Sequence, residues 1–288
     1  MKKSYIYAGI SILLWSTTAA IIKLLVSDLT SMQITAGCTF FASLSLILLT
    51  IFQKKISIIK TYKFKDYLNF IILGFIGIFI YYLMLNKSIN LLPAQEAFVI
   101  NYLWPIMIML FATFILKEKF SIYKLAALII SFMGVIIIAT NGNLLGMHFN
   151  SPTGVLMAVV AAISYGLFSV LVKKKNYDVS TLMMFCYITA FIISIIYLGF
   201  KFPSVTIYQL IGVIWLGVFT QGIPYATWAL ALNSGDTSKI SNLAFMTPIL
   251  STVFTFFILG ERLEWYLLLG LIFIICGIFI QSKRKCNK

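Results

Sequence analysis

The chain has 288 residues, of which 61% are hydrophobic and only 10% charged, and its mean hydropathy is +1.01. This composition excludes a soluble globular protein, because too few polar residues are present to cover the surface of such a fold. The net charge of +14 does not indicate nucleic-acid binding, since the lysines stand in short segments between apolar runs, where membrane topology explains them.

Ten apolar segments follow one another along the chain, separated by short polar breaks. A helix needs about 20 mostly apolar residues to cross a hydrocarbon core, so ten such segments account for nearly the whole length. The sequence therefore predicts an all-α integral membrane protein with ten transmembrane helices. In chain order the expected spans cover residues 5–26, 31–52, 66–86, 94–116, 122–140, 152–172, 179–200, 207–230, 240–259 and 265–282.

Basic residues are distributed unevenly among the loops between these segments. If the amino terminus is cytoplasmic, all but four of the 22 Lys and Arg residues also lie on the cytoplasmic side. Because positive residues concentrate in cytoplasmic loops, we expect a multi-pass protein of the cell membrane with both termini in the cytoplasm. The four exceptions are Lys23, Lys87, Lys201 and Arg262.

The segment 105–138 reappears at 248–281, at a constant offset of 143 residues. Matches among Leu, Ile and Phe carry little weight in so apolar a chain, but prolines, glycines and acids do. An offset held without a gap predicts that residues 1–145 and 146–288 are two repeats that make the same five helices. The informative pairs are Pro105/Pro248, Glu118/Glu261, Tyr123/Tyr266, Gly134/Gly277, Gly74/Gly217, Tyr82/Tyr225 and Asn90/Asn233.

Each predicted repeat holds five spans, an odd number, so the second repeat must enter the membrane from the opposite side. Glu118 is then expected at the cytoplasmic end of the fourth span and Glu261 at the outer end of the ninth, and both, with Pro105 and Pro248, are candidate structural or gating residues. Two inverted repeats, related by a pseudo-twofold axis in the membrane plane, can enclose a cavity with equivalent inner and outer gates. This symmetry favours a transporter that works by alternating access over a receptor or a membrane enzyme.

The fourth predicted span carries the sequence Asn101-Tyr102-Leu103-Trp104-Pro105 near its middle. Tyr102 lies about 12 Å along the helix from Ala94, deeper than the interfacial belt where Tyr and Trp usually contact headgroups. Since a buried phenol or indole needs a hydrogen-bond partner, Asn101, Tyr102 and Trp104 are candidates to face a watered cavity.

Prolines interrupt the fourth and ninth predicted spans at equivalent positions. Pro105 removes one amide donor and is expected to free the carbonyl of Asn101, as Pro248 would free that of Ala244. The alternative is that Pro105 only kinks a packed helix. Its neighbours Tyr102 and Trp104, about 200° apart around the axis, would then not share one cavity.

Further polar-tipped residues stand at interior depth in other predicted spans. Individually each is more typical of packing than of binding. Together they would line a cavity offering stacking, cation-π attraction and a few hydrogen bonds, which suits small amphipathic solutes. They are Tyr81 and Tyr82 in the third span, Ser164 and Tyr165 in the sixth, and Gln221, Pro224, Tyr225 and Trp228 in the eighth.

The acidic residues give little sign of ion coupling. Proton-coupled carriers usually keep an ionisable group inside the membrane, yet all eight acids stand near span ends and only Glu96 could dip inward. Facilitated diffusion or exchange therefore fits at least as well as proton antiport. No metal site, cofactor or disulfide is expected, because the candidate ligands are scattered: Cys38, Cys186, Cys276, Cys286 and the single histidine, His148.

Over nearly its whole length the chain resembles the EamA type of the drug/metabolite transporter superfamily. Within it, three motifs are similar to the bacterial aromatic amino-acid exporter branch: residues 101–105, 225–228 and 247–251. The wider resemblance rests on the five-plus-five spans, Leu14-Trp15-Ser16 with Lys23, Pro105, Pro248, Glu118 and Glu261.

This resemblance implies export of amino acids or similar metabolites by facilitated movement or exchange. It also implies that the cavity is lined by four matching residues, Tyr81, Tyr102, Trp104 and Tyr165. The last position is commonly tryptophan in that branch. The expected partners are a small-molecule substrate and the lipid bilayer, with no nucleic acid and no cofactor, in a monomer or weak homodimer.

Two other functions remain open on the sequence. A multidrug or organic-cation exporter of the same fold, coupled to protons, would use an aromatic cavity equally well through cation-π contacts. An integral-membrane enzyme or a structural membrane protein is the third possibility. Against an enzyme stands the lack of a His, Cys or paired-carboxylate constellation at membrane depth.

Overall fold

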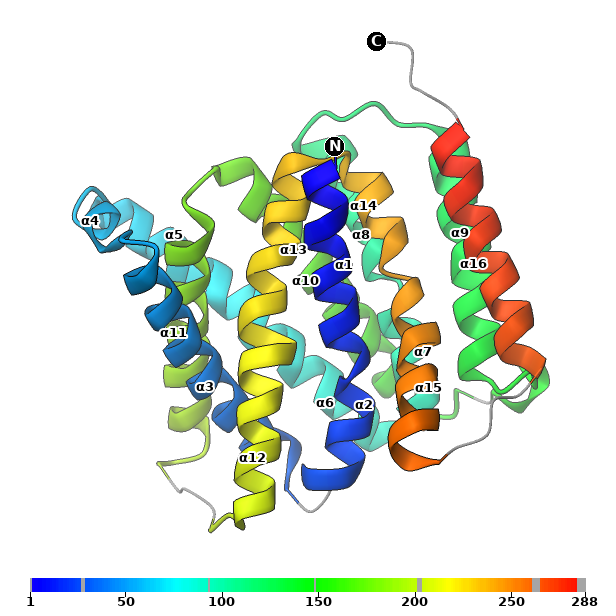
Figure 1. Cartoon of the computed structure of the whole chain (residues 1–288), viewed down its shortest axis with the longest axis horizontal. Helices are drawn as coiled ribbons and strands as arrows, with labels where there is room; N and C mark the ends of the chain where they lie inside the picture. The colour runs from blue at the N-terminus through cyan, green and yellow to red at the C-terminus, as the bar shows by residue number, and fades with distance from the viewer. Residues whose placement is uncertain are drawn as a thin grey trace.

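The computed structural model describes residues 2–26, 29–92, 94–147, 149–200, 204–260 and 265–283. Throughout these ranges every regular element is a helix, and the helices pack side by side in one bundle (Figure 1). The predicted Glu261 lies outside the described residues. An all-α fold is therefore confirmed for the part of the chain that can be seen.

The described ranges contain eight helical runs that are long and apolar enough to cross a membrane, and a shorter apolar helix covers Trp265–Gln281. The protein is thus a multi-pass membrane protein. The eight runs are Ser31–Phe52, Phe64–Leu91, Glu96–Ile115, Ile122–Ala139, Pro152–Lys175, Val179–Tyr197, Ile207–Ser234 and Thr237–Ile258.

The two halves of the chain contain matching series of helices. The first half consists of α1 (Lys2–Ser16), α2 (Thr18–Ile21), η1 (Ile22–Val26), α3 (Ser31–Phe52), α4 (Ile56–Ile59), α5 (Phe64–Gly74), η2 (Phe75–Ile80), α6 (Tyr81–Leu91), α7 (Ala94–Asn101), α8 (Trp104–Ile115), α9 (Ile122–Ala139) and η3 (Leu144–Gly146). The second consists of α10 (Pro152–Lys175), α11 (Val179–Tyr197), α12 (Ile207–Trp215), η4 (Leu216–Gly222), α13 (Ile223–Ser234), α14 (Thr237–Leu243), α15 (Met246–Leu259) and α16 (Trp265–Lys283).

The first apolar segment is not one uninterrupted helix. It divides into α1, α2 and the π-helical η1, with the first break at Thr17. Ser16 Oγ donates to Ile12 O at 2.6 Å and Thr17 Oγ1 to Leu14 O at 2.8 Å. Hydroxyl groups that bond to carbonyls of the preceding turn bend a helix, which explains the interruption.

The fourth and ninth predicted spans are each broken in the middle, at equivalent positions. α7 ends at Asn101 and α8 begins at Trp104, while α14 ends at Leu243 and α15 begins at Met246. Each proline falls in the first turn of the new helix, where a missing amide hydrogen costs no intrahelical bond.

The expectation that Pro248 leaves the carbonyl of Ala244 free is wrong. Thr247 N donates to Ala244 O at 3.0 Å, so a tight turn satisfies that carbonyl locally. The break before Pro105 is closed in a similar way, since Leu103 O accepts bonds from Ile106 N and Met107 N, both at 3.0 Å.

The third and eighth spans both contain a π-helical segment, η2 and η4, at matching positions. Both runs extend past the predicted ends, to Leu91 and Ser234. The first stops because Leu92 precedes Pro93 and is extended, with φ −128° and ψ 155°, as a residue before proline prefers.

A close helix crossing recurs in the two halves, and in each a cysteine Sγ contacts a backbone carbonyl oxygen of the neighbouring helix. Cys186 Sγ approaches Phe70 O at 3.7 Å, and Cys38 Sγ approaches Val213 O at 3.8 Å, where Phe70 and Val213 are equivalent at the offset of 143. The two cysteines, scattered in sequence, thus occupy equivalent places in the two halves. Gly74 lies against the backbone of Cys186 in the same way as Gly217 lies against that of Cys38.

Helices α9 and α16, which are equivalent, pack against each other and run in opposite directions (Figure 1). Ser131 Oγ donates to Ile274 O at 3.4 Å, and these residues are 143 apart. Glycines allow the close approach, because a Cβ on Gly134 would meet Gly270 O at 2.6 Å. The chain begins at α1 and reaches the end of α16 at the same face of the bundle (Figure 1).

Candidate functional site

Eight aromatic side chains meet in the middle of the bundle and form what we call the ring cluster. They come from six helices, α1, α6, α8, α10, α11 and α13, that lie far apart in sequence. Most neighbouring rings meet edge to face or tilted, the arrangement that aromatic quadrupoles favour. The cluster consists of Trp15, Tyr81, Tyr82, Trp104, Tyr165, Tyr187, Tyr225 and Trp228.

Trp104 connects the two halves of the ring cluster. It is the first residue of α8, so the break before Pro105 aims its indole inward, and only 6% of it is exposed. Its ring centroid lies 5.1 Å from that of Tyr165 and 5.4 Å from that of Trp228. The ring of Trp15 packs against both of the other indoles, with its centroid 6.0 Å from that of Trp104 and 5.2 Å from that of Trp228.

Equivalent residues of the two halves touch at the ring cluster. The hydroxyls of Tyr82 and Tyr225 are 3.0 Å apart, and the two residues are separated by 143 positions. This contact between equivalent residues brings the two halves of the chain together at the ring cluster.

Several buried polar atoms of this region have no hydrogen-bond partner among the described residues. Asn101 Nδ2 donates to the hydroxyl of Tyr81 at 3.3 Å, but Asn101 Oδ1 has no partner. The hydroxyl of Tyr187 and the indole nitrogen of Trp228 are also unpartnered. Since buried polar groups are nearly always satisfied, these atoms are available to water or to a bound solute.

Tyr102 does not join the ring cluster. It stands in the turn between α7 and α8 and packs with the separate apolar cluster around Ile106, Met109 and Phe245. Tyr102 and Trp104 therefore belong to different clusters, as expected for positions about 200° apart around a helix. A role for Tyr102 in solute binding stays a prediction.

Sequence reasoning did not include Trp15 and Tyr187 among the site residues. Trp15 appeared only within the Leu14-Trp15-Ser16 motif, and its contact with Trp104 depends on how α1 packs. In the structure Trp15, like Tyr165, packs on Trp104 and Tyr225, but the offset of 143 pairs Trp15 with Ala158, so the repeat does not point to it. For Tyr187 the sequence holds no signal either.

A narrow space leads away from the ring cluster between α10 and α13. Only about 10 Å³ of it can hold the centre of a water molecule, which is roughly the room of a single bound water. The rings therefore fill most of this part of the interior. The space is lined by Tyr165, Phe168, Ser169, Val172, Met183, Tyr225, Trp228, Ala229 and Leu232.

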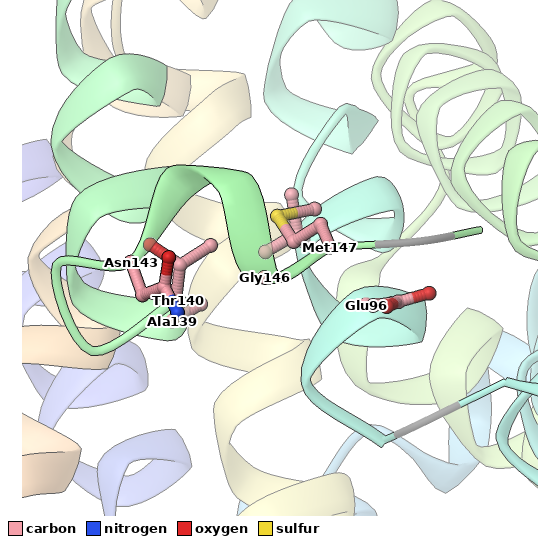
Figure 2. Close-up of a pocket in the computed structure, with 7 residues that line it drawn as sticks. Glu96, Ala139, Thr140, Asn143, Gly146 and Met147 are labelled. Atoms are coloured by element: carbon pink, nitrogen blue, oxygen red, sulfur yellow. The ribbon is translucent and has the colours of Figure 1, made fainter.

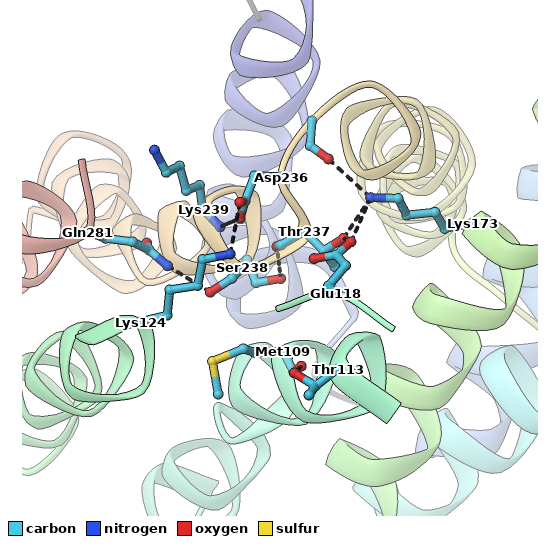
Figure 3. A network of polar contacts seen from close by, with 12 residues as sticks. Met109, Thr113, Glu118, Lys124, Lys173, Asp236, Thr237, Ser238, Lys239 and Gln281 are labelled. Carbon is cyan, nitrogen blue, oxygen red and sulfur yellow. Dashed lines mark hydrogen bonds and ion pairs between the residues drawn. The ribbon is translucent and has the colours of Figure 1, made fainter. Parts of the chain in front are cut away.

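A charged network lies just beyond the residues of α10 and α13 that line this space, and Figure 3 shows its side chains. Lys173 Nζ donates to Glu118 Oε1 at 3.1 Å, to Gly235 O at 3.1 Å and to Thr237 Oγ1 at 2.7 Å. Thr237 Oγ1 in turn donates to Glu118. Glu118, predicted as a gating residue, therefore joins α10 and α14 at one end of the bundle.

A second ion pair lies beside this network; Figure 3 shows Lys124 to the left of Glu118 and Lys173 to its right. Lys124 Nζ and Asp236 Oδ2 are 2.9 Å apart, and Asp236 Oδ1 accepts from Lys239 N at 3.0 Å, which caps α14. Partial burial opposes the charged form of Asp236. The bonds from Lys124 and Lys239 outweigh it and lower the pKa of Asp236 below its ordinary value.

A larger pocket lies elsewhere, near the start of α7 (Figure 2). Its empty volume, mouth included, is about 540 Å³, and no ring of the cluster lines it. Glu96 is 5% exposed there, and its Oε2 accepts from Phe149 N at 3.1 Å. The pocket is lined by Glu96, Val99, Ala139, Thr140, Asn143, Gly146 and Met147.

The two-repeat architecture corresponds to a known family. The sequence profile of the EamA-like transporter family matches residues 2–140 and again residues 152–282. The chain belongs to this transporter family. The double match agrees with the division of the helices into two equivalent series.

Individual proteins similar to this EamA-family chain cover most or part of it. An uncharacterized transporter of Clostridium kluyveri is 26% identical over all of this chain and 96% of its own length. The aromatic amino acid exporter YddG of Ancylobacter novellus is 27% identical over 62% of this chain and 64% of its own length. A solved crystal structure has the same fold, with a TM-score of 0.86 at 22% identity, and covers 98% of this chain and 97% of that one.

Proposed function

We propose that this EamA-family protein is a secondary transporter that exports aromatic or other amphipathic amino acids, or related small metabolites, by alternating access. The observation that carries the proposal is the ring cluster, in which Tyr82 and Tyr225, equivalent residues of the two halves, are in contact. A solute bound there would touch equivalent groups of both repeats. Facilitated diffusion or exchange of the solute would require no coupling ion in addition to such a site.

The proposed topology has ten spans in two inverted repeats, residues 1–145 and 146–288. The eight long runs, the helix at Trp265–Gln281 and the interrupted segment α1–α2–η1 together supply ten segments. An even number of crossings agrees with α1 beginning and α16 ending at one face (Figure 1). The positive-inside rule places that face in the cytoplasm of a cell-membrane protein.

The solute class is proposed from the chemistry of the ring cluster. Offset and edge-to-face rings bind a planar aromatic side chain well, and unpartnered atoms of Asn101, Tyr187 and Trp228 supply a few polar contacts. The 27% identity to a protein named as an aromatic amino acid exporter supports the same choice. An organic cation is the competing solute, because it would gain cation-π attraction from the same rings.

Counterflow in proteoliposomes tests the proposal directly. Vesicles preloaded with unlabelled L-phenylalanine or L-tryptophan should accumulate the labelled amino acid, and protein-free vesicles should not. The solute recovered from the lumen should be chemically unchanged, which distinguishes transport from an enzymatic reaction. Accumulation of labelled tetraphenylphosphonium without any amino-acid exchange would contradict the proposal and support the proton-coupled cation exporter.

A further inference from the structure

The charged network lies in line with the residues that line the narrow space. On α10 these residues recur about once per turn from Tyr165 to Val172, and on α13 from Tyr225 to Leu232. The next positions along the two helices include Lys173, which donates to Gly235 O at 3.1 Å. The network therefore lies directly after the residues that line the space on both helices.

None of the residues that line the space is charged, whereas Lys173, which directly follows the lining residue Val172, pairs with Glu118. Their side chains are only 20% and 25% exposed. The two are in direct contact, and each also bonds to Thr237. One cation and one carboxylate are thus presented together next to this apolar space, which we call the path.

We propose that Lys173 and Glu118 recognise the zwitterionic head of an α-amino acid, with Lys173 pairing with the α-carboxylate and Glu118 with the α-ammonium. This inference rests on the proposed function and names the chemical class of its solute. An entering zwitterion exchanges one ion pair for two, so no charge is left unpaired when the network opens. The aromatic side chain would then point along the path toward Trp228 and Tyr165.

Breaking the contact also opens the path, because the same bonds hold the end of α10 to α14 and to Gly235. A solute with a single charge can satisfy only one of the two side chains. The other would be left partly buried without its partner, which is strongly unfavourable. The network therefore selects zwitterions over amines and over simple carboxylates.

The test compares three solutes that share a phenyl ring: L-phenylalanine, L-phenylalaninamide, which keeps only the ammonium, and 3-phenylpropionate, which keeps only the carboxylate. Each is measured as a competitor of labelled L-phenylalanine counterflow in proteoliposomes. Wild-type protein should prefer L-phenylalanine. Lys173→Gln should lower the apparent affinity for L-phenylalanine about tenfold relative to the affinity for the amide, because a charge-assisted bond is lost.

Glu118→Gln should shift the preference in the opposite direction, toward 3-phenylpropionate, since the repelling carboxylate is gone. Lys173→Arg keeps the charge and should keep the wild-type order of solutes. Lys124→Gln is the matched control, because it removes a neighbouring ion pair, with Asp236, that includes neither Lys173 nor Glu118. If a single variant does not fold, the double variant Glu118→Gln with Lys173→Gln leaves no unpaired charge and should lose both preferences.

The inference would be overturned if Lys173→Gln and Glu118→Gln each changed the apparent affinity for all three solutes equally. The network would then only hold α10 and α14 together. If the wild-type protein showed no L-phenylalanine exchange, that result would instead contradict the proposed function. The two failures are therefore distinguishable in one set of measurements.

Discussion

At the scale of single residues, Trp104 joins the two repeats, because its ring packs on Tyr165 of α10, Trp228 of α13 and Trp15 of α1. Its indole stands where the helix restarts, so its direction depends on the turn at Tyr102 and Leu103. Residues of this kind combine packing and binding, and only measurements that separate folding from flux can divide the two roles.

Trp104→Ala is expected to reduce flux per folded molecule at least tenfold. The substitution removes a ring from the centre of the cluster and also costs about 3–5 kcal/mol of folding free energy in a packed core. Flux is therefore normalised to the amount of monodisperse protein recovered from the membrane. Trp265→Ala is the control, since Trp265 is 62% exposed and outside the cluster. Unchanged flux per folded molecule would refute the role of Trp104.

Glu96→Gln is expected to leave flux and its pH dependence largely intact. Glu96 lies in the first turn of α7 and lines the pocket near Phe149 rather than the ring cluster. Loss of the charge at the start of α7 should cost about 0.3–1 kcal/mol of favourable interaction with the helix dipole, and the amide of Gln can still accept the bond from Phe149 N. Counterflow measured from pH 5.5 to 8 checks this, and a variant that loses its pH dependence would identify Glu96 as a coupling group.

At the scale of elements, interruptions rather than straight helices shape the interior. The breaks α7/α8 and α14/α15 and the π-helical segments η2 and η4 occur in matching pairs. Such irregular backbone is tolerated at membrane depth only where protein or a watered cavity surrounds it. Close packing between η2 and α11, and between η4 and α3, keeps these irregular segments buried.

Gly217→Ala is expected to destabilise the protein by about 1–3 kcal/mol, because an added methyl group overpacks the crossing of η4 and α3. The new Cβ would lie 2.7 Å from the carbonyl oxygen of Cys38, which belongs to the backbone and cannot move aside. Gly9→Ala is the control, since no atom lies within 4 Å of its added Cβ. Thermal unfolding in detergent measures both, and equal midpoints would show that η4 and α3 can separate freely.

Asp236→Asn is expected to lower stability by less than about 1 kcal/mol at neutral pH, as it keeps the cap of α14 but loses the ion pair with Lys124. The folded-state pKa of Asp236 is lowered, so its contribution is present above about pH 4 and is lost as pH falls through the lowered pKa. Unfolding midpoints of the two proteins should differ at pH 6 and converge in strong acid. A difference that persists at the lowest pH would exclude this ion pair as its source.

At the scale of the whole molecule, equivalent residues of the two halves touch at Tyr82 and Tyr225 and at the pairing of α9 with α16. Lys173, Glu118 and Thr237 join α10 and α14 at one end of the bundle. Under the proposed alternating access, inverted repeats would form an equivalent closure at the other end when this network opens.

Cysteine labelling tests the inverted topology. In a cysteine-free background, Lys119→Cys should react with a membrane-impermeant maleimide only from the cytoplasmic side, and Arg262→Cys only from outside. The expectation follows because Glu118 and Glu261 are equivalent residues of inverted repeats. Labelling of both positions from one side would contradict the inversion and remove the basis for the transport mechanism.

The sequence by itself determined the class of fold, the two repeats and the family. These follow from local composition and from the spacing of prolines, glycines and acids, which the offset of 143 preserves in chain order. It also singled out most members of the ring cluster, because polar-tipped aromatics at membrane depth are unfavourable against lipid tails.

Only the tertiary structure decided which rings meet. Tyr102 packs in the apolar cluster and Trp104 in the ring cluster, and which neighbours each meets depends on helices from both halves of the chain. Trp15 and Lys173 find their partners through the packing of α1 and α10 against elements more than 50 residues away. The physical reason is that helix rotation and crossing depend on long-range packing, which the pattern of residues along one segment does not contain.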